Sequence, residues 1–366
     1  MPAPFTCRWG ILGPGWIASV FAKDLVLDPK TRGVEDVVHV VQAAASATSF
    51  DRAKQFLVDV GAPSATAYGS YVELVNDPNV DIIYIATPHS HHFPQCILAL
   101  NAGKPVVCEK PFTVNAEQTK ILVNLAREKK LFLMEAVWTR FFPLSIEIRQ
   151  LIKDGKIGDV KRVIADLSLC QDPETKYDDS HRMVNPDLAG GVLLDLGLYP
   201  LTWVYQTLYH TLPDAEKAAP TITGAISKYH TGVDIETVVV CKFPSSVGIA
   251  TSSVRVATDP EETGYPAIKI QGTKGEIRVD HPAYCPTGYT IVPVGKGSKV
   301  ERFERPIPAG KGMHWEADGA ARCLRDGKME SDVMPLDESI LIMETMDTLR
   351  AQCDFKYPAN IESTEH

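Results

Sequence analysis

The chain contains 366 residues, of which 45% are hydrophobic, so it is long and apolar enough for two domains with packed cores. Its net charge of −9 disfavours a nucleic-acid or anionic-membrane partner, since both need a basic surface. We expect no membrane span, because no apolar run reaches the roughly 18 residues that a bilayer requires, and no signal peptide is visible.

The eight cysteines are scattered along the chain and form no CxxC pair. Several of them, such as Cys108 and Cys241, stand in apolar segments. This pattern is typical of reduced thiols in protein cores and not of a disulfide framework. We therefore expect a cytoplasmic protein.

The first predicted unit is a strand at residues 8–12, a glycine turn, and a helix that continues to about residue 25. The turn reads Gly13-Pro14-Gly15-Trp16-Ile17-Ala18, a GxGxxA in the strand–turn–helix context of a dinucleotide-binding fingerprint. Gly13 allows the tight turn, and Gly15 lets the backbone approach a pyrophosphate. We expect Gly13, Gly15, Trp16 and Ile17 to bind a coenzyme at the start of this helix.

The second predicted strand, residues 37–45, leads into a segment rich in hydroxyl groups. An NAD enzyme would place an acid at this strand end to bind the ribose 2′-hydroxyl. The segment instead reads Ser46-Ala47-Thr48-Ser49-Phe50-Asp51-Arg52. Ser46, Thr48 and Arg52 suit a 2′-phosphate, which predicts NADP; the alternative is that Arg52 is a solvated helix residue.

The predicted strand at residues 80–86 ends at Thr87-Pro88-His89-Ser90-His91-His92. Three histidines invite comparison with a metal site, but no carboxylate or cysteine stands at ligand spacing. We therefore predict no metal. Thr87, Pro88 and His92 are expected at the coenzyme, with His92 donating a hydrogen bond to the nicotinamide ribose.

A short apolar strand at residues 106–108 ends in Glu109-Lys110-Pro111. The carboxyl ends of strands are where open α/β sheets hold ligands. A lysine there can act as a fixed positive charge beside an alcohol or carbonyl, although it can equally be a surface residue. We expect Glu109 and Lys110 to contact the coenzyme. Strands and helices alternate up to residue 136, which predicts a doubly wound parallel sheet.

After residue 138 the pattern changes to one helix, residues 146–153, and a series of alternating strands. This predicts a mostly antiparallel open sheet with helices on one face, an α+β domain after an α/β domain. We place the boundary at residue 138, with a coenzyme domain at 1–138 and a substrate-binding and dimerisation domain at 139–366. The predicted strands cover residues 160–169, 222–229, 237–243, 248–256, 267–270, 276–279 and 289–292, and the late helices cover 314–326 and 336–352.

One segment of the second domain breaks the strand pattern, from Gly190-Gly191 through Asp195 to Tyr199-Pro200. Proline is tolerated in the first turn of a helix, so the helix is predicted to begin near Asp195. Asp195 and Tyr199 are then four residues apart on one face. The alternative is a capping aspartate and a core tyrosine.

The GxGxxA, the Glu-Lys-Pro after a strand, and the GGxxxDxGxY at residues 190–199 resemble the Gfo/Idh/MocA oxidoreductases over nearly the full chain. Most members carry histidine where this chain has Tyr199. With residues 131–143, this tyrosine is similar to a branch that holds dihydrodiol dehydrogenases and fungal NADP-dependent D-xylose 1-dehydrogenases. Residues 84–93 and 179–191 resemble the xylose enzymes in particular. The dihydrodiol type has a further arginine near Thr48, which is absent here.

The resemblance implies oxidation of the anomeric C1 hydroxyl of D-xylose to the 1,5-lactone by hydride transfer to NADP+. It implies Lys110, Asp195 and Tyr199 as catalytic residues. Tyr199 would accept the hydroxyl proton, Lys110 would favour the phenolate, and Asp195 would orient the sugar or the other two. Rival interpretations are a dihydrodiol dehydrogenase or carbonyl reductase of the same family, and a non-catalytic NADP-binding regulator.

We expect the sugar to meet Trp138, His181, Arg182 and Asn185 in addition to Asp195 and Tyr199. Trp138 would flank the nicotinamide or stack on the sugar, with a core position at the domain boundary as the alternative. His181, Arg182 and Asn185 would hydrogen-bond sugar hydroxyls. A homodimer formed through the uncovered face of the second sheet is expected.

Overall fold

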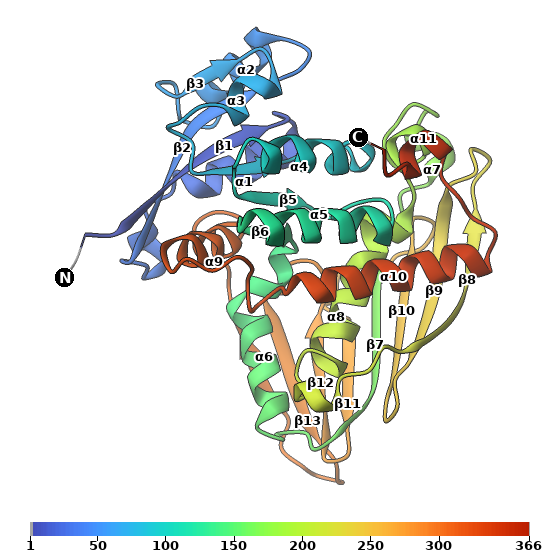
Figure 1. The fold of residues 1–366 in the computed structure, drawn as a ribbon. Coiled ribbons are helices and arrows are strands. Elements are labelled where there is room, and N and C mark those ends of the chain that lie inside the picture. Colours follow the sequence, from blue (N-terminus) through green and yellow to red (C-terminus); the bar gives the residue numbers. More distant parts are fainter. Residues whose placement is uncertain (1–2, 366) are drawn as a thin grey trace.

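The computed structural model describes residues 3–365, which form two β-sheets joined near residue 137 (Figure 1). The first sheet has six parallel strands in the order β3-β2-β1-β4-β5-β6. This is the order of a dinucleotide-binding fold, which holds its ligand where the order reverses between β1 and β4. The strands are β1 (Phe5–Leu12), β2 (Val37–Ala45), β3 (Thr66–Tyr68), β4 (Ile82–Ile85), β5 (Val106–Glu109) and β6 (Leu133–Ala136).

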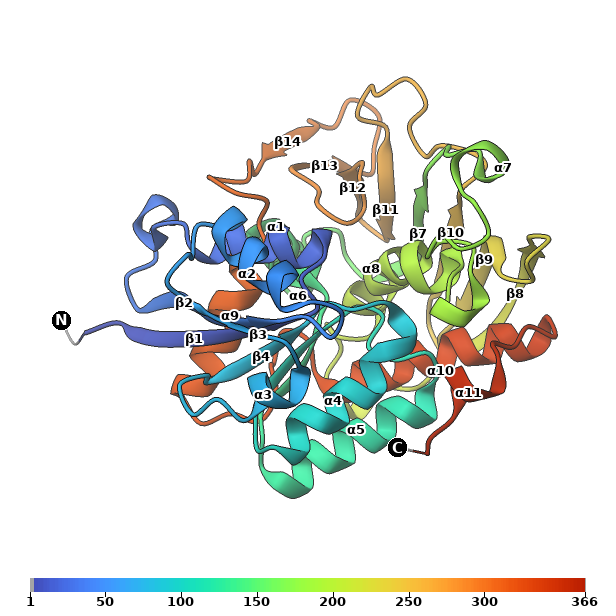
Figure 2. The same ribbon diagram turned by 90° about the horizontal axis from the view of Figure 1, so that it is seen from above.

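Helices cover both faces of this sheet because its strands bury side chains on both sides. In β1, Trp9 and Ile11 face one core with α1 (Trp16–Leu25), α2 (Phe50–Asp59) and α9 (His314–Arg325). Leu12 faces the other core with α3 (Tyr71–Val75), α4 (His92–Asn101) and α5 (Ala116–Lys129), and α4 and α5 lie side by side below the sheet in Figure 2. The predicted doubly wound sheet is confirmed.

The second sheet has eight strands in the order β14-β13-β12-β11-β7-β10-β9-β8. Only the β7–β10 pair is parallel, so the predicted mostly antiparallel sheet is confirmed. Two short strands, β3 and β14, were not predicted, since runs of three and four residues carry too little periodicity. The strands are β7 (Val160–Ser168), β8 (Thr221–Lys228), β9 (Asp234–Lys242), β10 (Val247–Ser253), β11 (Pro266–Gly272), β12 (Gly275–Asp280), β13 (Gly288–Pro293) and β14 (Glu301–Glu304).

Helices α8 (Leu198–Leu208) and α10 (Leu336–Gln352) pack against one face of the second sheet, and α6 (Pro143–Lys153) packs against α8 (Figure 1). A π-helical turn, η5 (Leu193–Gly197), continues directly into α8. Short helical segments complete the chain: α7 (Pro173–Lys176), α11 (Ala359–Glu362), η1 (Pro29–Arg32), η2 (His89–His91), η3 (Trp138–Phe141), η4 (Pro186–Leu188) and η6 (Asp214–Glu216).

The first sheet ends with β6 at Ala136, two residues before the predicted boundary. The second segment nevertheless returns to the first sheet, because α9 packs on β1 and β2. Asp318 of α9 pairs with Arg32 at 2.8 Å and with His39 at 2.9 Å, and all three side chains are at most 2% exposed. Helix α9, which lies within the predicted second domain, therefore packs on the first sheet, and the sequence pattern did not indicate this.

By length and composition, Pro186–Leu208 is apolar enough to cross a bilayer, although the sequence alone suggested no such stretch. In the structure 94% of its most apolar window is buried inside the protein. The segment lies between α10 and strands β7 and β10, so its apolar residues are core residues.

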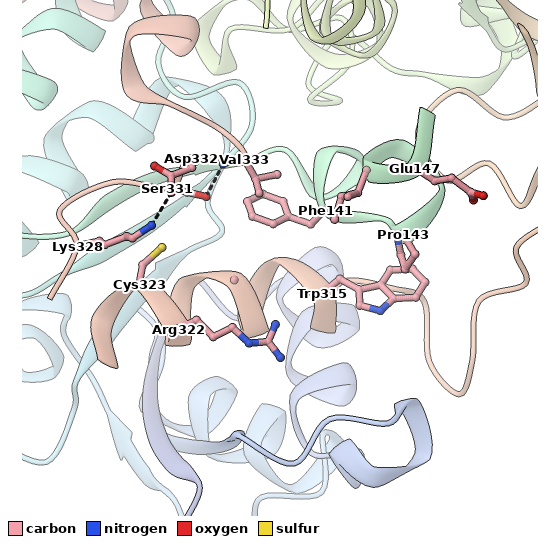
Figure 3. A pocket seen from close by; sticks show the side chains of 12 residues that line it. Phe141, Pro143, Glu147, Trp315, Arg322, Cys323, Lys328, Ser331, Asp332 and Val333 are labelled. Atoms are coloured by element: carbon pink, nitrogen blue, oxygen red, sulfur yellow. Dashed lines mark hydrogen bonds and ion pairs between the residues drawn. The ribbon is translucent and has the colours of Figure 1, made fainter. Parts of the chain in front are cut away.

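A cavity of about 530 Å³ lies between α6 and α9 (Figure 3). Phe141, Trp315 and Val333 line it, and Lys328 pairs with Asp332 at its rim. None of the predicted catalytic residues lines this cavity. The candidate site must therefore be sought at the ends of the strands.

Candidate active site

The GxGxxA turn lies at the carboxyl end of β1, beside the segment that follows β4. Gly13 has φ +86°, and a Cβ there would lie 2.5 Å from Thr87 Cγ2. A Cβ at Gly15 would meet nothing within 4 Å. Trp16, 78% exposed, and Ile17 begin helix α1. At Gly13 the turn therefore packs directly against the segment that follows β4. At Gly15 it leaves space for a pyrophosphate in front of the first turn of α1.

The predicted 2′-phosphate segment follows β2, the neighbour of β1. Ser46 Oγ lies 3.0 Å from Thr48 Oγ1, and the exposed Arg52 stands in the first turn of α2. Burial raises the pKa of Tyr71, while a hydrogen bond to the Ala47 backbone and the charge of Arg52 act to lower it. The Tyr71 ring, which was not predicted, therefore borders this segment. Hydroxyls, an arginine and a helix start suit a phosphate group.

The structure contradicts the expected contact between His92 and a nicotinamide ribose. His92 is 0% exposed, and its two ring nitrogens face the carbonyl oxygens of Pro111 at 2.7 Å and Thr87 at 2.9 Å. Burial, assisted by the neighbouring His89, lowers its pKa to about 3. Neutral His92 has a single N–H, so it donates to one of these two carbonyl oxygens while its ring lies between the loop after β4 and the loop after β5.

His89, one helical turn earlier, faces the candidate site instead. Its Nδ1 lies 2.9 Å from the Ala189 carbonyl oxygen, and its Nε2 lies 3.7 Å from Asp195 Oδ1. Sequence reasoning missed it because three histidines in four positions carry no signal of which one points outward. Within residues 3–365 no group of three or more His, Cys, Asp and Glu residues could hold a metal ion.

Lys110 follows the last residue of β5 and crosses to the second domain. Its Nζ donates to the Asp195 carbonyl oxygen at 2.9 Å and to Asp195 Oδ1 at 3.1 Å. The turn is held from below by the buried Glu135 of β6, whose carboxylate accepts the Phe112 N–H at 3.0 Å. The carboxylate of Glu109 is buried and accepts from the Tyr84 hydroxyl and the Lys110 N–H, so it faces inward beneath the sheet edge.

Asp195 lies in η5 with three cationic or polar partners around one oxygen. In addition to Lys110 and His89, Arg182 Nη1 donates to Oδ1 at 3.2 Å. Burial by itself raises the pKa of this carboxyl, but the Lys110 charge, His89 and Arg182 hold it well below its usual value. These partners therefore favour the ionised form of Asp195, which orients Lys110.

Tyr199 lies in the first turn of α8, on the same side as Asp195. Lys110 Nζ is 5.0 Å from the centre of the Tyr199 ring, and Trp138 Nε1 donates to the phenol oxygen at 3.0 Å. Burial and the Glu109 charge raise the pKa of Tyr199 well above its usual value. The Lys110 ammonium binds Asp195 and not the phenol, so the net direction of the Tyr199 pKa, which the sequence left open, is upward in this structure.

Aromatic rings complete the wall beside Tyr199. The Trp138 ring stacks on Tyr284 with centres 6.1 Å apart, and Tyr284 lies 5.8 Å from the Tyr199 ring. Tyr284 comes from the segment after β12 and had no sequence signal. Trp138 is partly exposed and packs against the core, with its Nε1 at the Tyr199 phenol.

Of the three loop residues predicted to hydrogen-bond sugar hydroxyls, only Arg182 contacts Asp195 directly. The His181 ring stacks on Tyr177 with centres 4.3 Å apart, and its Nδ1 accepts the Met183 N–H. The Asn185 side chain accepts the Asp187 N–H as the cap of η4. His181 and Asn185 thus shape the loop that carries Arg182.

Family models match both halves of the chain. A model described as an oxidoreductase family with an NAD-binding Rossmann fold matches residues 7–137, and a GFO/IDH/MocA C-terminal domain model matches residues 146–278. The chain belongs to the Gfo/Idh/MocA oxidoreductase family. In this family setting, Lys110 of the first domain and Asp195 and Tyr199 of the second come together as predicted from their motifs.

Two kinds of curated relative match nearly the whole Gfo/Idh/MocA chain. The D-xylose 1-dehydrogenase (NADP(+)) of Hypocrea jecorina is 54% identical over 97% of this chain and 94% of its own length. The human trans-1,2-dihydrobenzene-1,2-diol dehydrogenase is 35% identical over 96% of this chain and 98% of its own length.

Solved structures share the fold at low identity. Levoglucosan dehydrogenase, in complex with NADH and levoglucosan, has a TM-score of 0.83 at 17% identity and covers 96% of this chain and 99% of its own. The aldose–aldose oxidoreductase of Caulobacter crescentus has a TM-score of 0.76 at 22% identity, with 95% and 98% covered. These likenesses support the two-sheet architecture.

The two turn glycines give a matched pair of substitutions. Gly13→Ala should destabilise the fold by about 1–3 kcal/mol, because its Cβ meets Thr87 at a positive φ. Gly15→Ala should change stability by less than about 1 kcal/mol but weaken coenzyme binding, because its Cβ enters the pyrophosphate approach. Urea unfolding and NADPH fluorescence titration measure the two effects; equal behaviour of the variants would contradict the assignment.

Proposed function

We propose that this protein oxidises the C1 hydroxyl of D-xylose to the 1,5-lactone by hydride transfer to NADP+. The observation that carries the proposal is the meeting of Lys110, Asp195 and Tyr199 at the carboxyl edge of the first sheet. The 54% identity to a D-xylose 1-dehydrogenase over 97% of the chain supports the substrate. Other aldoses that present the same anomeric hydroxyl are expected as further substrates.

NADP+, with its pyrophosphate on the Gly13–Ala18 turn and its 2′-phosphate at Ser46, Thr48 and Arg52, would supply the hydride acceptor. The chain itself must place the sugar, exclude water and take the hydroxyl proton. Asp195, ionised and fixed by Lys110 and Arg182, can accept a hydrogen bond from a sugar hydroxyl. Lys110 can donate one to the C1 oxygen and stabilise negative charge that develops there.

Tyr199 is the group that we assign to exchange a proton with the C1 hydroxyl. Its oxygen accepts from Trp138, so its own O–H is left to point toward the substrate. Because the phenol is protonated in the free structure, this geometry suits donation to a carbonyl in lactone reduction. Oxidation needs the phenolate, and the positive nicotinamide of the bound coenzyme favours that form.

The composition of the site favours a sugar over a flat diol. The aromatic wall of Trp138 and Tyr284 would suit either substrate. Arg182, His89 and the ionised Asp195 add charged and polar groups to the site, which the several hydroxyls of a sugar can satisfy more fully than the two hydroxyls of a cyclic dihydrodiol. A dihydrodiol dehydrogenase is therefore the second candidate. A non-catalytic NADP-binding regulator would have no need for Lys110 and Tyr199.

A panel of aldoses and cyclic diols, each with NADP+ and NAD+, tests the proposal. The highest kcat/KM should be for D-xylose with NADP+. A cyclic dihydrodiol that exceeds every sugar would establish the second candidate. One stoichiometric burst of NADPH without turnover would favour the regulator.

Tyr199→Phe should lower kcat by about 10²- to 10⁴-fold, the usual contribution of a positioned proton acceptor, while NADPH binding is retained. Since the pKa of Tyr199 is raised, the phenolate fraction grows as pH rises toward that pKa. Wild-type oxidation should therefore accelerate from neutral to alkaline pH, and the variant should lose this slope. The same slope in both proteins would remove Tyr199 as the proton acceptor.

Arg52→Glu should weaken NADP+ binding far more than NAD+ binding. The exposed guanidinium would meet the 2′-phosphate, and a carboxylate there repels it. The measurement is the ratio of KM values for the two coenzymes. The matched control is Lys54→Glu, because Lys54 is exposed on α2, the helix that also carries Arg52.

We propose a cytoplasmic homodimer, formed through the face of the second sheet opposite α8. Ile164, Ile249 and Val240 lie side by side across β7, β10 and β9, and all three are partly exposed. An apolar row on an open sheet can pack against the same row of a second copy of the chain. The cytoplasmic location that we propose is supported by the eight cysteines, all of which are free thiols. Ile249→Lys should convert the dimer to a monomer in light scattering.

A further inference from the structure

The turn that carries Asp195 is held by two residues distant in sequence. Tyr357 of the C-terminal segment donates its hydroxyl to the Gly190 carbonyl oxygen at 2.6 Å. Asp234, the first residue of β9, accepts the Leu193 N–H at 2.5 Å. These two hydrogen bonds therefore fix the backbone at Gly190, before the turn that leads into η5, and at Leu193, the first residue of η5.

Asp234 and the turn fit closely around Gly191. Gly191 has φ +113°, and a Cβ there would lie 2.1 Å from Asp234 Oδ1. Asp234 is 0% exposed, and its Oδ1 has no hydrogen-bond partner among the described residues. Burying a carboxylate with one unpartnered oxygen lowers the stability of the fold. The hydrogen bond from the Leu193 N–H partly offsets this loss.

The charge of Asp234 strengthens its bond to Leu193. Burial raises the pKa of Asp234 to about 6, against the opposing backbone N–H groups of Leu193 and Val192 and the Arg350 charge. When the carboxyl is ionised, its bond to Leu193 is charge-assisted. The same anion stands at the start of the continuous η5–α8 helix, where the helix dipole favours it.

The C-terminal segment is itself held firmly against the domain. Arg350 of α10 lies over the Tyr357 ring, 5.1 Å from its centre, and binds Glu362. The Tyr357 N–H donates to the same glutamate at 3.1 Å. Tyr357 is 4% exposed, so its hydroxyl has one fixed direction, toward Gly190.

We propose that Asp234 and Tyr357 are positioning residues, which set Asp195 at the distance where its carboxylate and carbonyl oxygens hold Lys110. Neither residue touches the reacting atoms. Their effect passes through three residues of backbone, Gly190–Val192, and through η5 to Asp195. The C-terminal segment thereby takes part in arranging a site to which it contributes no side chain.

Tyr357→Phe, Asp234→Asn and Asp234→Leu test this proposal, which presupposes the dehydrogenase activity. Tyr357→Phe removes one hydroxyl and should lower kcat about fivefold, while Asp234→Asn should lower it by about tenfold or more. Asp234→Leu, which keeps no acceptor for Leu193, should fall below Asp234→Asn. The NADPH dissociation constant should stay within about twofold, because the coenzyme loops belong to the other sheet.

Tyr205→Phe is the matched control. Tyr205 is buried in α8 and bonds Thr345 of α10, so its variant loses one buried tyrosine hydrogen bond away from the site. It should lower the melting temperature as Tyr357→Phe does, yet leave kcat unchanged. If Tyr357→Phe and Asp234→Asn also keep kcat within about twofold of wild type, the proposal is overturned, whatever their melting temperatures.

Hydrogen exchange gives a readout that does not depend on the substrate. The peptide that spans residues 189–197 should exchange faster in Tyr357→Phe and Asp234→Asn than in wild type and in Tyr205→Phe. Unchanged exchange in both variants would overturn the proposal even if no sugar is oxidised. Absence of activity in wild type, with faster exchange in the variants, would overturn the proposed function alone.

Discussion

The ion pair between Lys110 and Asp195 joins the two sheets at the point where chemistry is possible. Lys110 stands at the end of a strand in the first sheet, and Asp195 lies in the π-helical turn before α8. The two are 85 residues apart in sequence and 3.1 Å apart in space. Both are nearly buried, where a charge without its partner would cost several kcal/mol. Each residue therefore needs the other, and Tyr199 is placed beside this pair.

A second buried carboxyl group stabilises the turn that carries each member of the ion pair. Glu135 accepts the Phe112 N–H below the Lys110 turn, and Asp234 accepts the Leu193 N–H before Asp195. Burial raises the pKa of Glu135 to about 7 and that of Asp234 to about 6. Each of the two turns that form the site is thus fixed by a backbone N–H bond to an acidic side chain of a strand. This arrangement explains how loops at strand ends hold a defined geometry.

Much of the fold follows from local patterns in the sequence. The glycine turn after β1 and the Glu-Lys-Pro after β5 stand at strand ends, and the helix expected at residues 336–352 is present as Leu336–Gln352. The return of α9 to the first sheet does not follow, because it depends on the buried contacts of Asp318 with Arg32 and His39. Such contacts leave no periodic trace in either segment.

The sequence by itself determined the two-sheet class and the coenzyme turn, because turn chemistry and strand-end positions are local properties, and the family resemblance of its motifs singled out Lys110, Asp195 and Tyr199. Only the tertiary structure decided that His89 and not His92 faces the site, and that Tyr199 is kept neutral. It also brought Tyr357 to Gly190 across 167 residues. Hydrogen-bond partners and desolvation depend on neighbours that are remote in sequence, so the motifs that name the residues leave their protonation and support open.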